Sequence, residues 1–94
     1  MGLSDINTTF KAISDPTRRQ ILALLKKKDL SAGQLSGHFP ISKPSLSHHL
    51  NILKNANLID QERRGQEIIY SINMTVFYEI STELINTFNL GRKK

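Results

Sequence analysis

The chain has 94 residues, of which 38% are hydrophobic, and it carries a formal net charge of +5 with no cysteine. A chain of this length predicts one domain (residues 1–94) with a modest core, and its basic charge favours a polyanionic partner without requiring one. The lack of cysteine excludes disulfides, thiolate metal ligands and thiol-based redox chemistry. No apolar run is long enough to span a bilayer and no secretory signal pattern is found, so we expect a cytoplasmic protein.

Two helices are predicted before residue 30. The first covers about residues 5–13 and has three apolar residues at helical spacing: Ile6, Phe10 and Ile13. The second begins with Asp15 as N-cap and Pro16 at its first position. Its core-facing residues are predicted to be Ile21, Leu24 and Leu25. Arg18 and Arg19, near its start, could reach a phosphate, and one of them could equally pair with a carboxylate.

A short helix over residues 31–39 follows, with Ser31 as its N-cap. Pro40 ends this helix. Ser42 then caps the next one, and Pro44 fits into its first turn because a missing N–H costs nothing there. Two short helices joined by a tight turn predict a helix-turn-helix, in which the second helix reads DNA.

The second of these helices begins after Ser42 and has two faces with different chemistry. Its apolar stripe consists of Leu46, Leu50 and Leu53. The opposite face and its flanks are polar, free of carboxylates, and hold the predicted DNA contacts: Lys43, Pro44, Ser45, Ser47, His48 and Asn51. Such groups at a helix start suit phosphates and base edges in a major groove. An amphipathic helix without a DNA role is the alternative interpretation, although an ordinary solvated face more often mixes Glu with Lys.

Residues 58–72 form two strand-like runs around a Gly-containing tip, which predicts a β-hairpin. The tip carries Arg63 and Arg64. A hairpin with basic residues after a recognition helix is typical of the wing of a winged helix, which touches the flanking DNA backbone or minor groove. We therefore expect both arginines to contact phosphate; the alternative is a solvated turn.

A last helix is predicted over residues 75–88, with an aromatic-rich stripe of Phe77, Ile80, Leu84 and Phe88. Together with Ile6 and Phe10 of the first helix, this stripe offers more apolar area than so small a core needs, and the natural solution is a two-fold homodimer. The predicted division is a DNA-binding core (14–72), dimerisation helices (1–13 and 74–90) and a basic tail (91–94).

Four segments of the chain closely resemble the ArsR/SmtB family of bacterial winged-helix transcriptional repressors: residues 10–22, 42–53, 57–66 and 69–72. The Ser-Asp-Pro-Thr-Arg-Arg and Ser-His-His-Leu motifs are specific in combination, and the resemblance covers nearly the whole chain. It implies a mainly α (α+β) winged helix-turn-helix with about five helices and a two-stranded hairpin wing, dimerising through its first and last helices. The chain looks most like the metal-independent members, among them small autorepressors of sporulation-delay toxin and immunity operons.

The sequence argues against metal sensing. Sensors of arsenic, cadmium or lead use thiolates, and the zinc or nickel version needs Asp and His on the last helix, which here offers only Glu79 and Glu83. His48 and His49 are adjacent on a helix and diverge by about 100°, so they cannot chelate together. We interpret His49 as a packed, hydrogen-bonded residue and His38 as a surface or capping residue. No metal or other cofactor is expected.

The expected function is sequence-specific transcriptional repression by a homodimeric autorepressor that binds an inverted-repeat operator in double-stranded DNA. Repression would be relieved by a membrane-bound immunity protein that sequesters the repressor, as the resemblance suggests, or by an unidentified ligand. The alternative function is a winged-helix protein-interaction module without specific DNA binding. An enzyme is not expected, because no nucleophile with a base, catalytic carboxylate pair or nucleotide loop occurs in a recognisable context.

Overall fold

The computed structural model describes residues 3–89. Within this range it contains α1 (Leu3–Ile13), α2 (Pro16–Lys27), β1 (Leu30–Ser31), α3 (Ala32–Ser36), α4 (Lys43–Asn55), β2 (Ile59–Arg64), β3 (Glu67–Ile72) and α5 (Met74–Phe88). The predicted basic tail, the last residue of the predicted second dimerisation segment and the first two residues of the chain lie outside the described residues. The predicted order of elements is confirmed.

The three helices of the predicted DNA-binding core begin directly after the residues predicted to cap them. The Asp15 carboxylate accepts a hydrogen bond from the Arg18 N–H at 3.1 Å before α2. Ser42 Oγ accepts one from the backbone N–H three residues later, at 3.2 Å, before α4. Ser31 and Gln34 form a capping box before α3, in which each side-chain oxygen accepts from the other residue's N–H, at 3.1 and 2.8 Å. These contacts satisfy N–H groups that the first turn of a helix leaves without partners.

The helix α3 is shorter than predicted, because it ends at Ser36 rather than Phe39. The N–H groups of His38 and Phe39 donate to the carbonyls three residues before them, Leu35 and Ser36, at 3.0 and 3.4 Å. Such bonds tighten the backbone beyond an α-helix. The chain therefore turns earlier and leaves residues 37–42 to connect α3 to α4.

The C-terminus of α4 is closed by an asparagine in the left-handed region. Asn57 has φ +61°, the Leu58 N–H donates to the Leu53 carbonyl at 3.0 Å, and the Asn57 N–H donates to the Lys54 carbonyl at 2.9 Å. This is the Schellman arrangement, in which asparagine can replace the usual glycine. It directs the chain from α4 straight into β2.

The sheet has three antiparallel strands in the order β1-β3-β2. The predicted hairpin is β2–β3, with Ile59 opposite Ile72 and Arg64 opposite Glu67. Gly65 takes the first position of the two-residue turn at φ +62°, where type II′ turns need a positive φ. The short strand β1 pairs with β3 and was not predicted.

The hydrophobic core lies where the helices meet the sheet, because α2 and α3 contact β3 while α4 contacts β2. Its largest fully buried side chains are Ile21, Leu25, Leu35, Leu53, Leu58 and Ile59. Leu24, predicted to face the core, is only half-buried at its edge. The core thus anchors α4 by one face and leaves its other face outside.

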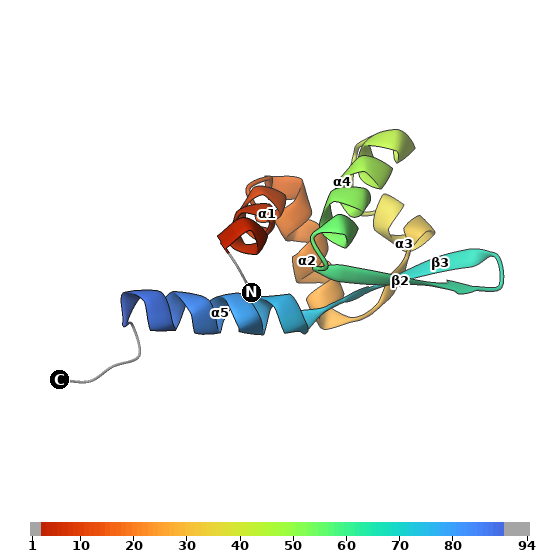
Figure 1. Cartoon of the computed structure of the whole chain (residues 1–94). Helices are drawn as coiled ribbons and strands as arrows, with labels where there is room; N and C mark the ends of the chain where they lie inside the picture. Colours follow the sequence, from red (N-terminus) through yellow and green to blue (C-terminus); the bar gives the residue numbers. More distant parts are fainter. Residues whose placement is uncertain (1–2, 90–94) are drawn as a thin grey trace.

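The molecule is elongated, with extents of 53 × 22 × 20 Å. The hairpin tip and the N-terminal end of α4 lie toward one end, and α5 extends toward the other (Figure 1). No helix in residues 3–89 is long and apolar enough to cross a bilayer. The fold therefore separates the predicted DNA-binding elements from much of the predicted dimerisation surface.

Candidate DNA interface

The two faces of α4 are arranged as the sequence predicts. Leu46, Leu50 and Leu53 are 4%, 3% and 0% exposed. All six predicted DNA contacts on this helix are exposed: Lys43, Pro44, Ser45, Ser47, His48 and Asn51. The first turn contains no acidic residue, so its free N–H groups and the Lys43 ammonium can approach phosphate without a nearby carboxylate.

The two wing arginines differ in their surroundings. Arg64 donates from Nε and Nη2 to Glu62 Oε1 at 3.1 and 2.9 Å, which forms an exposed ion pair. The Arg63 side chain makes no hydrogen bond or ion pair with any residue in the described range. Because side chains alternate along a strand, Arg63 shares a face with Gln61, which lies opposite Tyr70. The wing therefore presents one engaged and one free guanidinium.

The face of the hairpin that carries Arg63 is the face turned toward the helix-turn-helix. Tyr70, on this face, lines a pocket of about 210 Å³ together with residues of α3 and α4, including Lys43 and Ser47. Partial burial raises the pKa of the Tyr70 phenol. Strand geometry thus orients Arg63 toward the side on which α4 lies, whereas Arg64 lies on the outer side of the hairpin.

Arg18 and Arg19 contact the end of α1, an arrangement that the sequence did not indicate. Arg18 is 8% exposed, and its Nε and Nη2 donate to the carbonyls of Ala12 and Lys11 at 2.6 and 3.2 Å. Arg19 Nη1 donates to the Ile13 carbonyl at 2.8 Å. The last carbonyls of a helix have no partner within it and carry partial negative charge. Both side chains therefore stabilise the C-terminus of α1.

His49 is packed and hydrogen-bonded, as predicted. Its Nδ1 lies 3.1 Å from Arg18 Nη1 and 3.9 Å from Asp15 Oδ2. Desolvation is the largest single influence on the Asp15 carboxyl and raises its pKa, but hydrogen bonds from Arg18 and Thr17, the charge of Arg18 and the charge that His49 carries when protonated outweigh it. The net effect holds the pKa of Asp15 below its ordinary value.

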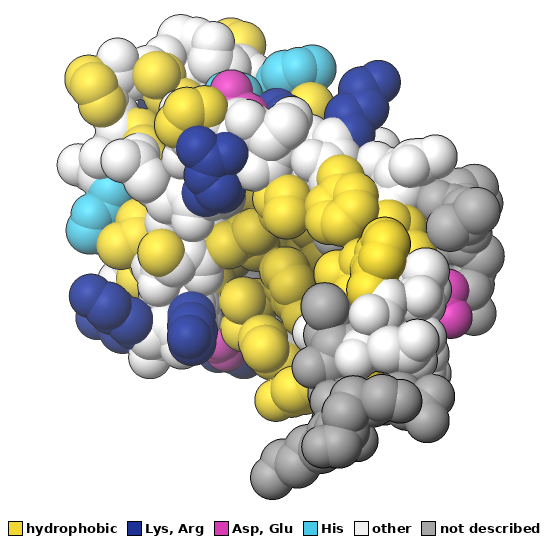
Figure 2. Space-filling view, turned by 90° about the vertical axis from the view of Figure 1, so that its left-hand side faces the viewer, with side chains coloured by type: hydrophobic (Ala, Val, Ile, Leu, Met, Phe, Trp, Pro, Cys, Tyr) yellow, Lys and Arg dark blue, Asp and Glu magenta, His cyan; other side chains and the backbone are white. Residues whose placement is uncertain are grey.

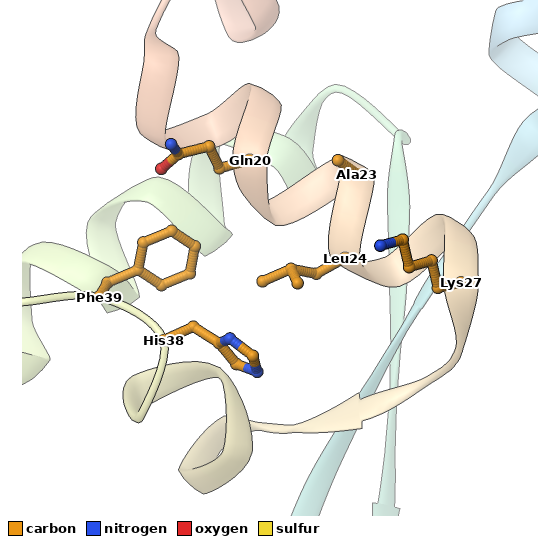
Figure 3. A pocket seen from close by; sticks show the side chains of 6 residues that line it. All are labelled: Gln20, Ala23, Leu24, Lys27, His38 and Phe39. Carbon is orange, nitrogen blue, oxygen red and sulfur yellow. The ribbon is translucent and has the colours of Figure 1, made fainter.

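His38 lies on the surface, as predicted, at the edge of an open pocket of about 300 Å³ between α2 and the end of α3. Leu24 and Lys27 approach it from α2, and Phe39 lies on the other side (Figure 3). No carboxylate lines this pocket. In residues 6–89, no three His, Cys, Asp or Glu side chains are grouped so that they could hold a metal ion, and metal independence stays a prediction.

The end of the molecule opposite the wing has an apolar surface. Seen from the side of α1 and α5, hydrophobic side chains gather in a hollow (Figure 2). All the exposed large hydrophobic residues in the described part of the chain lie on these two helices: Phe10 at 45%, Tyr78 at 66%, Ile85 at 44% and Phe88 at 64%. A small monomeric domain seldom exposes so many large apolar side chains together.

The predicted interface residues divide into three groups by burial. Phe10 and Phe88 are exposed, Phe77 and Leu84 are half-buried against the core, and Ile6 and Ile80 are 8% and 6% exposed within it. The two isoleucines therefore support α1 and α5 from inside and offer little area to another molecule. Tyr78 and Ile85 of α5 were not predicted as interface residues, but both are exposed. Each adjoins a stripe residue in sequence, and sequence spacing alone did not show how far the exposed surface extends around α5.

Comparisons with known proteins agree with this geometry. Residues 15–61 match the family described as bacterial regulatory protein, arsR family. The chain is 56% identical over 86 residues to the transcriptional repressor SdpR of Bacillus subtilis (strain 168), covering 92% of this chain and 96% of that protein. It is 36% identical over 93 residues to the arsenical resistance operon repressor of Staphylococcus xylosus, covering 97% and 89%.

The fold is also found among solved structures. A crystal structure of an ArsR family transcriptional regulator matches with a TM-score of 0.88 at 23% identity, covering 100% of this chain and 97% of that one. The family and the relatives named above are transcriptional regulators, which are not enzymes. With its capped helix-turn-helix, its hairpin wing and these relatives, the chain belongs to the arsR family of bacterial regulatory proteins.

Proposed function

We propose that this protein is a sequence-specific DNA-binding repressor of transcription that acts in the cytoplasm on its own operon. The observation that supports this most strongly is the outward face of α4, where every predicted contact is exposed and the first turn has no carboxylate. A helix is narrow enough to enter the major groove, where hydroxyl, imidazole and amide groups can distinguish base pairs. Its relatives named as repressors support the same function.

Two copies of the chain bind the operator together. The exposed apolar residues of α1 and α5 supply a self-complementary surface, and a two-fold axis through it presents two copies of α4 to the same duplex. The operator is then an imperfect inverted repeat, with half-site centres about 10 base pairs apart if the helices enter successive major grooves. Repression follows because the bound dimer covers the promoter.

Within each half-site the two elements have different roles. Ser45, Ser47 and His48 contribute the preference for particular bases, with Pro44 and Asn51 beside them on the same exposed surface. Lys43 and Arg63 bind the DNA backbone, because a free cation contributes affinity to any phosphate. Arg64 adds less, since part of its charge is already neutralised by Glu62.

Repression is relieved when a membrane-bound immunity protein sequesters the dimer. The resemblance to sporulation-delay autorepressors suggests this partner, and the absence of cysteine removes the thiolate route by which soft metals could act. Co-expression with candidate membrane proteins from neighbouring genes would test it. Release of the operator together with movement of the repressor to the membrane fraction would support this partner, and operator occupancy that none of them changes would contradict it.

Sequencing the DNA fragments that the purified protein retains from genomic DNA tests the proposed function. We expect enrichment of an inverted repeat upstream of the protein's own gene, and footprinting should show protection on one side of the duplex. Uniform retention of all fragments, or none, would contradict specific repression and favour a winged helix used for protein interactions.

A further inference from the structure

One buried side chain connects three helices of the DNA-binding core. Arg18 begins on α2, donates to the Lys11 and Ala12 carbonyls at the end of α1, and places Nη1 3.1 Å from Nδ1 of His49 on α4. The guanidinium is planar and holds its donors in a fixed fork. This rigid group therefore fixes the position of α4 relative to α1 and α2.

This contact requires one protonation state of His49. An arginine side chain has only donors, so Nδ1 has to accept, and the imidazole is neutral with its hydrogen on Nε2. A proton on Nδ1 would place two N–H groups and two positive charges against each other. The other titratable groups recorded beside this ring are the Asp15 carboxylate, whose Oδ2 is 3.9 Å from Nδ1, and His48, with ring centroids 5.8 Å apart. Asp15 Oδ2 already accepts the Arg18 backbone N–H.

The neighbours of His49 on α4 are the residues predicted to read bases. His48 precedes it directly and Ser47 lies two positions before it, and both are exposed. A side chain that reads bases has to be held to within about 0.5 Å of its productive position. A small shift of α4 against α2 is therefore enough to weaken reading while leaving contacts with phosphate largely intact.

We propose that Arg18 and neutral His49 are positioning residues that hold α4 in its reading orientation, and that protonation of His49 releases this hold and lowers preference for the operator. The inference rests on the proposed function, because it assumes that α4 reads DNA. It assigns opposite effects to two adjacent histidines. Protonation of exposed His48 adds charge at the DNA surface and strengthens binding to any phosphate, whereas protonation of His49 weakens specific binding.

The experiment measures the affinity for operator and for random DNA between pH 7.5 and 5.5, the range in which histidines change charge. His48→Asn removes the titration of His48. His48→Asn/His49→Asn also removes that of His49, while the Asn oxygen stays near the place of Nδ1 to accept from Arg18. We expect the operator-to-random ratio of His48→Asn to fall by about three- to tenfold on acidification, the range expected for loss of one hydrogen bond. The ratio of the double variant should stay constant.

Equal pH profiles for the two proteins, with specific binding intact, would overturn this inference and leave the proposed function standing. Absence of specific binding by the wild-type protein at every pH would contradict both. Arg18→Lys provides a second readout at pH 7.5, because lysine keeps the charge but cannot form the fork, and the operator-to-random ratio should fall severalfold. If thermal unfolding shows that Arg18→Lys is not folded, the pH profiles of His48→Asn and His48→Asn/His49→Asn test the inference by themselves.

Discussion

The recognition helix and the wing both belong to the proposed DNA interface, but they carry opposite kinds of surface. The outward face of α4 has hydroxyls, an imidazole and an amide with a single cation, Lys43. The hairpin has two arginines among three carboxylates, which are Asp60, Glu62 and Glu67. Charge alone would thus not locate the interface. We propose that α4 supplies selection between sequences and that the wing supplies backbone affinity through one free arginine.

Binding to an inverted repeat requires the proposed dimer, so substitutions that prevent dimerisation should have the largest effect. Ile85→Asp/Phe88→Asp places two carboxylates on exposed apolar positions of α5, so we expect folded monomers in sedimentation experiments. Operator affinity should fall by about 10²-fold or more, because two linked binding events become independent. Asn86→Asp, an exposed position on another side of the same helix, is the matched control. A double variant that still sediments as a dimer would rule out this interface.

Removing the reading groups should have the next largest effect. Ser45→Ala/His48→Ala leaves the buried face of α4 unchanged, and it should reduce the preference for operator by about 1–3 kcal/mol per lost base contact. Affinity for random DNA should change little. Competition binding with labelled operator measures both quantities, and a variant that keeps its operator-to-random ratio would contradict the role of these side chains.

The two arginines of the wing should differ from each other. Arg63→Ala should weaken operator and random DNA by similar factors and reduce the salt slope by about one unit, as expected for one lost phosphate contact. Arg64→Ala should have a smaller effect because Glu62 already holds that guanidinium. Glu62→Gln should increase affinity for both DNAs. Equal losses of DNA affinity in the two alanine variants, measured across a salt series, would show that the Arg64–Glu62 ion pair does not affect DNA binding.

Asp15, the N-cap of α2, is not one of the predicted DNA contacts. Its loss should therefore lower the stability of the fold more than the preference for operator DNA. Asp15→Ala removes an N-cap and should lower the free energy of unfolding. The folded-state pKa of Asp15 is lowered, so its ionisation stabilises the fold above the unfolded pKa of about 4, and this stability is lost as pH falls through the folded pKa. Asp15→Asn should keep the cap and remove this acid dependence. Urea unfolding at several pH values measures it.

Metal removal should have the smallest effect on both regions. EDTA or added zinc should leave operator affinity unchanged, since no group of three suitable ligands lies within residues 6–89. Calorimetry would detect the opposite case, which is a tight stoichiometric zinc site whose occupancy changes DNA affinity.

Local signals in the sequence predicted much of this structure, whereas long-range contacts were missed. Asp15, Ser31 and Ser42 cap the predicted helices because a cap depends on residues three positions away. The two residues of β1 are too few to show a pattern, and they become a strand only by pairing with Ile69 and Tyr70.

In the candidate interface too, local patterns predicted which residues share a helix face, but not which single side chains are buried by long-range contacts. Helical spacing separated the two faces of α4 correctly, because its apolar residues all face one core. Helical spacing did not show that Ile6 and Ile80 are buried in the hydrophobic core, nor that Arg18 is buried. Those outcomes depend on how α1, α2 and α5 pack around residues distant in the sequence.

A double-mutant cycle between protein and operator tests the division of roles most directly. Each base pair of one half-site is replaced in turn, and binding is measured for the wild type, His48→Ala and Arg63→Ala. We expect the cost of substitution at one or two base pairs to disappear in His48→Ala, and Arg63→Ala to leave the cost at every base pair unchanged. Coupling of Arg63 to particular base pairs, with none for His48, would contradict the assignment of reading to α4 and backbone affinity to the wing.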